Sequence, residues 1–195
     1  ELKALYEAEL KGGVAQLPNL TFQHEDFVRL QQQRLTSPQG EQDWLFWQEQ
    51  LAGDLPVINL PTDHPRPPVQ SLRGASHAFA IDAHLLGQLK ELAQQQGVTL
   101  FMLLLAAYQV MLHRYSGQDD ILVGSPMSGR THQDLVNVVG YFVNPVVLRA
   151  RLSGDQPFTD FLAQVRQTVI GALEHQAFPF PTLVERLRPP RDAST

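Results

Sequence analysis

The sequence predicts an α/β sandwich of α+β character, in which helices cover a mixed β-sheet. Residues 75–81 alternate as in a strand, with His77, Phe79 and Ile81 on one side. Long helical patterns follow at 83–96 and 100–115, and apolar runs follow at 120–130 and 138–152. Strands that alternate with long helices pack as layers around one core, so we expect a sheet with helices against it.

Composition and charge exclude several classes of protein. The chain has 195 residues, of which 43% are hydrophobic, so it can bury a sizeable core. Its formal net charge is −5 and it has no run of Lys or Arg, which argues against a nucleic-acid partner. It has no Cys, which excludes disulfides, thiolate metal sites and a Cys nucleophile and fits a reducing, cytoplasmic setting. The longest apolar run, residues 100–108, is too short to span a bilayer, so we expect no membrane partner.

The first part of the chain predicts two helices joined by a connector. Residues 1–11 show helical spacing of apolar residues and end at a pair of glycines. We expect residues 14–40 to be mostly loop, with an apolar-aromatic island at 22–30. Residues 41–51 predict an amphipathic helix, with Trp44, Leu45, Trp47 and Leu51 near one face. A proline-rich segment at 55–68 then predicts extended chain close to polyproline II.

The two middle helices have clear start and stop signals. Asp82 and Thr99 are placed to cap them, because a side-chain oxygen there can accept a hydrogen bond from a free N–H of the first turn. Gly97 and Gly117 follow the last helical residues. The second helix is apolar nearly all round from 100 to 107, so we expect it to be central and buried.

Apart from the stretch that begins at residue 138, the remaining elements are a strand, a loop and two helices. Residues 120–130 predict a buried strand that runs into a loop of Gly, Ser and Pro. This loop lacks the GxxxxGK[ST] and GxGxxG spacings, so we reject a nucleotide site and regard it as a candidate wall of a ligand channel. Pro157 predicts the start of a helix that runs to about 174, residues 175–181 break it, and Thr182 is expected to cap a short helix at 183–187.

The stretch 138–149 carries the least ordinary pattern of the chain. Its aromatic and β-branched residues predict a strand buried on both faces. Gly140 indicates that another group approaches the backbone, and Asn144 needs hydrogen-bond partners or a ligand. Pro145 cannot donate to a ladder. From the pattern alone, a bulged edge strand with a satisfied Asn is the favoured interpretation.

Several short motifs point together to one family. They are Asp26-Phe27, FWQEQLAG at 46–53, LPTDHPRP at 60–67, YSGQDDI at 115–121, Gly124-Ser125-Pro126 with Gly129-Arg130, GYFVN at 140–144, HQAFPFP at 175–181 and RDAS at 191–194. Together they resemble the second half of the condensation domain of nonribosomal peptide synthetases. The departures from that pattern are His24 in place of Tyr, Arg29 and Leu30 in place of an apolar residue and Trp, Pro145 in place of Thr, and Ala177 and Pro181 in place of Asp and Glu.

The resemblance implies a chloramphenicol-acetyltransferase-like fold of two lobes with a tunnel between them. Residues 1–53 would be the end of the N-terminal lobe and the connector, and 54–195 an incomplete C-terminal lobe. Because both ends interrupt a pattern, we interpret the chain as a piece of a longer, bacterial polypeptide. Its partners would be the missing N-terminal lobe, upstream and downstream carrier domains and an adenylation domain. The carrier domains would present substrates on phosphopantetheine arms, with no metal and no cofactor bound directly.

The family's chemistry is amide formation between carrier-bound thioesters. It relies on an HHxxxDG motif that this chain lacks, since it contains no adjacent pair of His. We therefore expect this piece alone to be inactive. A cyclisation or epimerisation relative remains an alternative, although Val143-Asn144 argues against epimerisation. A non-catalytic docking or gatekeeping module for carrier domains is the alternative from another class.

The resemblance also assigns roles to residues. The expected tunnel residues are Gly124, Ser125, Pro126, Gly129, Arg130, Gly140, Tyr141, Phe142, Val143 and Asn144. The motif residues with expected structural roles are Asp26, Trp47, Arg149, His175, Gln176, Arg191 and Asp192. Asn144 would either support the reaction centre or be a structural amide. Arg149 would either pair with a carboxylate across the lobes or lie at the surface, and His175 and Gln176 are expected to fix a turn.

Overall fold

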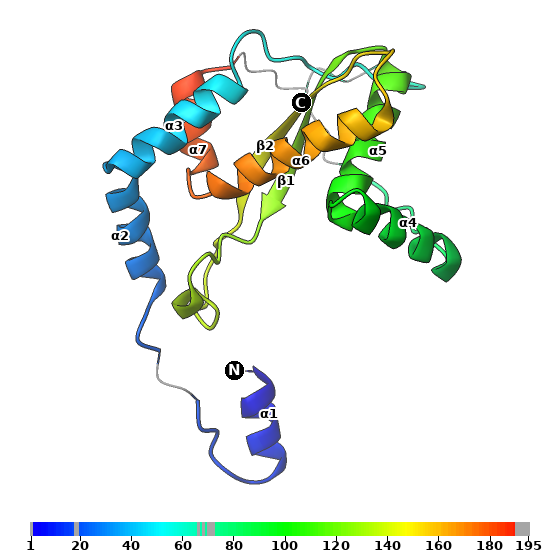
Figure 1. Cartoon of the computed structure of the whole chain (residues 1–195). Helices are drawn as coiled ribbons and strands as arrows, with labels where there is room; N and C mark the ends of the chain where they lie inside the picture. The colour runs from blue at the N-terminus through cyan, green and yellow to red at the C-terminus, as the bar shows by residue number, and fades with distance from the viewer. Residues whose placement is uncertain (1, 18–19, 66, 68, 70–72, 190–195) are drawn as a thin grey trace.

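The computed structural model describes residues 2–17, 20–65, 67, 69 and 73–189. Its elements are α1 (Leu2–Leu10), α2 (His24–Leu35), α3 (Pro38–Gln50), α4 (Ala83–Gln95), α5 (Leu100–Ser116), β1 (Asp120–Met127), η1 (Gln133–Leu135), β2 (Asn144–Arg151), α6 (Phe158–Glu174) and α7 (Phe180–Leu187). Figure 1 shows the β1–β2 hairpin at the centre, crossed by α6, with α2, α3 and α7 on one side and α4 and α5 on the other. Arg191 and Asp192 lie outside the described residues.

The sheet in the described part of the chain is a hairpin of two antiparallel strands. β1 pairs with β2 from Asp120 opposite Arg151 to Met127 opposite Asn144. Pro126 faces Pro145 near the end that the connecting loop closes, so two residues without an N–H meet where the ladder stops. Helices packed on a sheet confirm the α/β class, but the sheet is antiparallel and not mixed.

The predicted strand at 75–81 is wrong. This segment is extended but belongs to no sheet of the described chain, and Phe79 is 81% exposed. A strand is stabilised by a ladder of hydrogen bonds with a neighbour, and the alternating pattern specifies a face but supplies no partner.

The predicted strand at 138–152 is shorter and less buried than its composition indicates. Residues 138–143 form loop, and the ladder begins at Asn144. Within β2, Val146, Leu148 and Ala150 are buried while their neighbours are partly exposed. The strand is therefore covered on one face, because a two-stranded sheet with α6 against it has one packed side.

Helices with local signals form where the sequence predicts them. The Asp82 carboxylate accepts a hydrogen bond from the Leu85 N–H at 2.9 Å, and the Thr99 hydroxyl accepts one from the Met102 N–H at 3.2 Å. Gly117 ends α5 with a φ of 69°, a left-handed conformation that suits glycine. These caps satisfy backbone groups that the helix ends leave free.

Three helical expectations need correction. Residues 24–35, expected as loop, form α2, whose first turn is fixed by a 2.9 Å hydrogen bond from the Gln23 N–H to Asp26. α7 begins at Phe180 after Pro179, so Thr182 lies inside the helix and does not cap it. α5 is not buried all round, since Phe101, Tyr108 and Met111 on one face are nearly half exposed.

No described helix is long and apolar enough to span a membrane by itself; α4 and α5 pass that test only as a pair bent by 101°.

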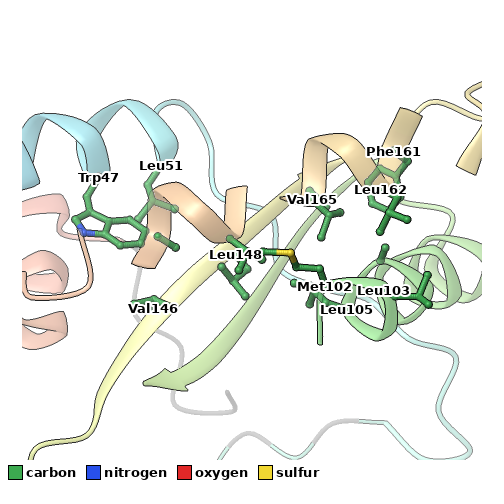
Figure 2. Close-up of a cluster of buried hydrophobic side chains, with 14 of the residues drawn as sticks. Trp47, Leu51, Met102, Leu103, Leu105, Val146, Leu148, Phe161, Leu162 and Val165 are labelled. Carbon is green, nitrogen blue, oxygen red and sulfur yellow. The ribbon is translucent and has the colours of Figure 1, made fainter. Parts of the chain in front are cut away.

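The main hydrophobic core lies where α6 crosses the hairpin. It joins β2 to α3, α5, α6 and α7, and Leu148 on β2 is 0% exposed at its centre. Figure 2 shows Trp47 of α3 and Leu51, which follows this helix, at one end of the cluster and Leu103, Phe161 and Leu162 at the other. A second, smaller cluster of Leu135, Val138 and Phe142, with Phe22 and Phe27 against it, lies in the loop between the strands and beside α2.

Candidate functional site

A cavity of about 460 Å³ lies between the α2–α3 region and the loop end of the hairpin, where residues 128–143 join β1 to β2; we call it the motif pocket. It is lined by Phe27, Leu30, Gln31, Gln33, Arg34, Ser37 and Gln39, by Gly129, Thr131, His132, Leu135 and Phe142 of the loop between the strands, and by Asn144, Gln176 and Ala177. The lining mixes aromatic rings with amide side chains. Such a surface suits a ligand that is mostly apolar and carries a few amide or carbonyl groups.

Asn144 holds the turn after α6 and the first residue of α7 against the hairpin. Its Nδ2 donates to the carbonyls of Gln176 at 2.8 Å and Phe178 at 2.7 Å, and its Oδ1 accepts from the Phe180 N–H at 2.9 Å. These are the backbone contacts that a structural amide would make, and the same side chain also lines the motif pocket. Its orientation at the pocket is therefore set by main-chain groups 32 to 36 residues away.

The loop between the strands is folded tightly at two glycines. Gly129 has a φ of +65°, and a Cβ there would collide with the carbonyl of Phe142. A Cβ at Gly140 would collide with the His24 ring, so His24 is the group whose close approach the sequence predicted at this position. His24 Nε2 also lies 3.3 Å from the carbonyl of Tyr141, to which it must be the donor.

Arg130 ties the same loop together from inside. Its guanidinium donates to the carbonyls of Leu135 and Val138, the latter at 2.9 Å, and lies 4.2 Å from the centre of the Phe142 ring. A cation over an aromatic face adds attraction to these hydrogen bonds. The loop wall of the motif pocket is thus braced by one side chain that contacts three parts of the loop.

The ten expected tunnel residues divide among three places. Gly129, Phe142 and Asn144 line the motif pocket. Arg130 and Gly140 line a neighbouring cavity of about 650 Å³, which Leu2 and Leu17 also contact. The remaining five, Gly124, Ser125, Pro126, Tyr141 and Val143, line neither of these two cavities.

A buried carboxylate that the sequence reasoning missed lies behind the pocket. Asp43 is 0% exposed and accepts hydrogen bonds from Arg34 Nε at 2.8 Å and from His175 Nδ1 at 2.8 Å. Burial acts to raise the pKa of Asp43, but the hydrogen bonds from Arg34 and His175 outweigh it and hold the pKa below its usual range. The available signal was its spacing, because Asp43 shares a helix face with the core residue Trp47 four positions later.

His175, Gln176 and Trp47 are joined at the turn after α6. The His175 ring stacks on Phe46 with ring centres 4.2 Å apart, and its carbonyl accepts from Trp47 Nε1 at 3.0 Å. Gln176 Nε2 donates to the Leu173 carbonyl at 2.8 Å. Each of these side chains therefore has partners that hold the turn in place.

Arg149 takes neither of the two expected positions. Its side chain is 7% exposed, and it pairs within the hairpin with Asp120, at 2.6 Å from Nη2. Nη1 and Nη2 also donate to the carbonyls of Gln50, Ala52 and Asp54 after α3. The hydrogen bonds from Arg149 outweigh burial and lower the pKa of Asp120. Arg149 therefore joins the end of α3 to both strands.

Comparison with known proteins agrees with the motifs. The chain matches the condensation-domain family model over residues 1–195. It is 45% identical over 179 residues to gramicidin S synthase 2 of Brevibacillus brevis, and 41% identical over 194 residues to surfactin synthase subunit 1 of Bacillus subtilis (strain 168). These alignments cover 92% and 100% of this chain but only 4% and 5% of those proteins, so the chain spans a small part of their length.

Solved structures give the same result for the fold. The crystal structure of the X-domain from teicoplanin biosynthesis matches with a TM-score of 0.87 and 29% identity, over 99% of this chain and 44% of that chain. A holo four-domain nonribosomal peptide synthetase bound to AMP and glycine matches with a TM-score of 0.82 and 29% identity, over 98% of this chain and 15% of that chain. The predicted resemblance and its fold are confirmed.

Proposed function

This chain belongs to the condensation-domain family, and on that premise we propose that it supplies one side of a tunnel in which a carrier-bound amine attacks a carrier-bound thioester. The nitrogen bonds to the thioester carbon and the carbon–sulfur bond breaks. The sulfur leaves on the donor's pantetheine arm as a thiol, which accounts for the proton that the amine loses as the amide forms. Residues 1–53 would serve as the end of the N-terminal lobe and the connector, and 54–195 as the C-terminal lobe. The substrates would arrive on phosphopantetheine arms of carrier domains within a cytoplasmic, bacterial synthetase that also contains an adenylation domain.

One observation carries this proposal. Gly129, Phe142, Asn144 and Gln176, which belong to three separate motifs, line a single cavity. The cavity combines apolar surface with amide groups, which suits a pantetheine arm and the acyl group it carries. A shared substrate accounts for the convergence of these separate motifs.

The contribution of this chain would be positioning. Aminolysis gains rate when the amine and the thioester are held in line, and it also needs a group that handles the amine proton. The chain has no HHxxxDG motif to supply that group. We therefore propose that its residues orient substrates and exclude water, and that amide formation requires the partner lobe.

The test is amide formation by the complete condensation domain between two loaded carrier domains. Asn144→Ala removes three main-chain contacts at the pocket edge, so we expect the rate to fall roughly tenfold or more. Asn59→Ala is the matched control, because Asn59 is exposed and lines neither cavity. An unchanged rate in Asn144→Ala would remove this residue from the site.

A second function, a docking platform without catalysis, is favoured by one comparison. An X-domain from teicoplanin biosynthesis that was solved in complex with OxyB matches this chain with a TM-score of 0.86. Under this alternative the complete domain would bind carrier domains or another protein but form no amide. The same assay decides between the two functions, because the docking platform would show binding with no amide product from the unsubstituted domain.

A further inference from the structure

We propose that Asp43 and His175 are positioning residues that set the orientation of the Asn144 amide through the main chain of the turn at 175–178. This inference rests on the proposed function of the motif pocket, because Asn144 and Gln176 line that pocket. Asp43 itself does not line the pocket, so it acts only through other residues.

The His175 ring is fixed by groups on α3. Asp43 is held on this helix by Arg34, and its low pKa keeps it as a carboxylate that can only accept hydrogen bonds. His175 Nδ1, at 2.8 Å from Asp43, must therefore carry a hydrogen and donate it. Phe46 stacks on the same ring, so α3 fixes both its rotation and its tautomer.

The backbone of the turn shares this constraint with the ring. The carbonyl of His175 accepts hydrogen bonds from Trp47 Nε1 at 3.0 Å and from the Phe178 N–H at 3.2 Å. Asp43 and Trp47 are four residues apart and lie on one face of α3. One helix face thus holds residue 175 at its side chain and at its carbonyl, and this fixes the path of the turn.

The turn at 175–178 also holds the wall of the motif pocket. Every hydrogen bond of the Asn144 side chain described above goes to the main chain of Gln176, Phe178 or Phe180. The amide has no such bond to its own hairpin among the described residues, so its plane follows the turn. If the turn moved, Asn144 and Gln176 would move with it, and the pocket wall would change shape.

The decisive variants separate the donor from the ring. His175→Phe keeps a ring that can stack on Phe46 but has no donor for Asp43, whereas His175→Asn places an amide N–H close to where Nδ1–H lies. His84→Phe, at an exposed position of α4, is the matched control. If His175→Phe does not fold, His175→Gln replaces it. The Gln amide lies one bond farther from the main chain than the Asn amide, so its N–H does not take the position of Nδ1–H.

The experiment measures two quantities in the complete condensation domain. With asparagine labelled at its side-chain ¹⁵N, we expect the Asn144 amide signals to shift in His175→Phe and to return near their original position in His175→Asn. In the amide-forming assay we expect kcat to fall roughly ten- to a hundredfold in His175→Phe, with KM little changed and with recovery in His175→Asn.

The two measurements can contradict the positioning role and the proposed function independently. Unmoved Asn144 signals in His175→Phe would overturn the positioning role, and so would shifted signals with an unchanged kcat. If His175→Asn lost as much activity as His175→Phe, the positioning role would also be overturned. That result would mean that the ring itself is needed, and not the hydrogen bond that it donates to Asp43. If the unsubstituted domain forms no amide, the proposed function fails, while the Asn144 signals still decide whether the pair orients this side chain.

Discussion

Two hydrophobic clusters support different walls of the motif pocket, and they differ greatly in size. The wall with Asn144 and Gln176 continues into the main core, where β2 meets α3, α5, α6 and α7. The wall with Gly129 and Phe142 rests on three buried residues of a loop and two partly buried rings beside them. The first wall can move only with the core, whereas the second can shift without disturbing it. A pocket built this way keeps one fixed side and one adaptable side.

The largest expected effect is at the centre of the main core. Leu148→Ala leaves a cavity where the side chain is 0% exposed, so we expect the free energy of unfolding to fall by roughly 3–4 kcal/mol. Urea denaturation followed by circular dichroism measures it. Val139→Ala, at a position 76% exposed, should change it by less than about 0.5 kcal/mol.

A smaller and local effect is expected in the second cluster. Phe142→Ala removes edge contacts to Phe27 and His24 and the stack under Arg130. We expect it to lower the free energy of local opening by about 2 kcal/mol. Hydrogen exchange should speed up in residues 129–143 and stay unchanged in β2 and α6. Equal acceleration in residues 129–143 and in β2 and α6 would mean that the two walls open as one cooperative unit. The loop wall would then not be able to shift independently of the core.

The smallest effect concerns the ion pair between Asp120 and Arg149, on the face of the hairpin that the core does not cover. Because Arg149 lowers the pKa of Asp120 in the folded protein, this carboxylate stabilises the fold at neutral pH. That stabilisation is lost as the pH falls below the ordinary value of about 3.9 and through the folded pKa. Asp120→Asn should therefore lower the free energy of unfolding by about 1–2 kcal/mol at pH 7.

Urea denaturation at a series of pH values checks the Asp120 prediction. The difference between Asp120→Asn and the unsubstituted protein should shrink as the pH is lowered from neutral toward the folded pKa. Asp63→Asn, in the exposed proline-rich segment, is the control and should show no such trend. A difference that grows toward acid would contradict the assigned direction of the pKa shift.

Local signals explain which parts of the fold could be predicted. The boundaries of α4 and α5 follow from Asp82, Thr99 and Gly117, whose effect is decided within four residues. α2 was not predicted because its run of glutamines interrupts the apolar stripe that marks a helix. Asp26 instead fixes its first turn, and Phe27 packs against Phe142 of the loop between the strands. The strand at 75–81 failed because pairing depends on a distant partner that periodicity does not reveal.

The site was predictable as a set of motifs but not as a set of contacts. The motifs predicted Gly129 and Asn144 as tunnel residues and Gln176 as a residue that fixes a turn, and all three line one cavity. The partners of Asn144 are backbone groups, which leave no trace in side-chain identity. Asp43 was hidden for a different reason, since a single acidic residue in an amphipathic helix normally faces water.

The hydrogen bonds of the Arg149 guanidinium have a consequence for chimaeric synthetases. All five N–H donors of its guanidinium are engaged, on Asp120 and on the carbonyls of Gln50, Ala52 and Asp54. Carbonyls are common to all amino acids, so this contact tolerates any side chains at 50–54 but depends on the path of the chain there. Recombination junctions between α3 and the proline-rich segment should therefore accept divergent sequences of equal length and reject insertions or deletions of even one residue.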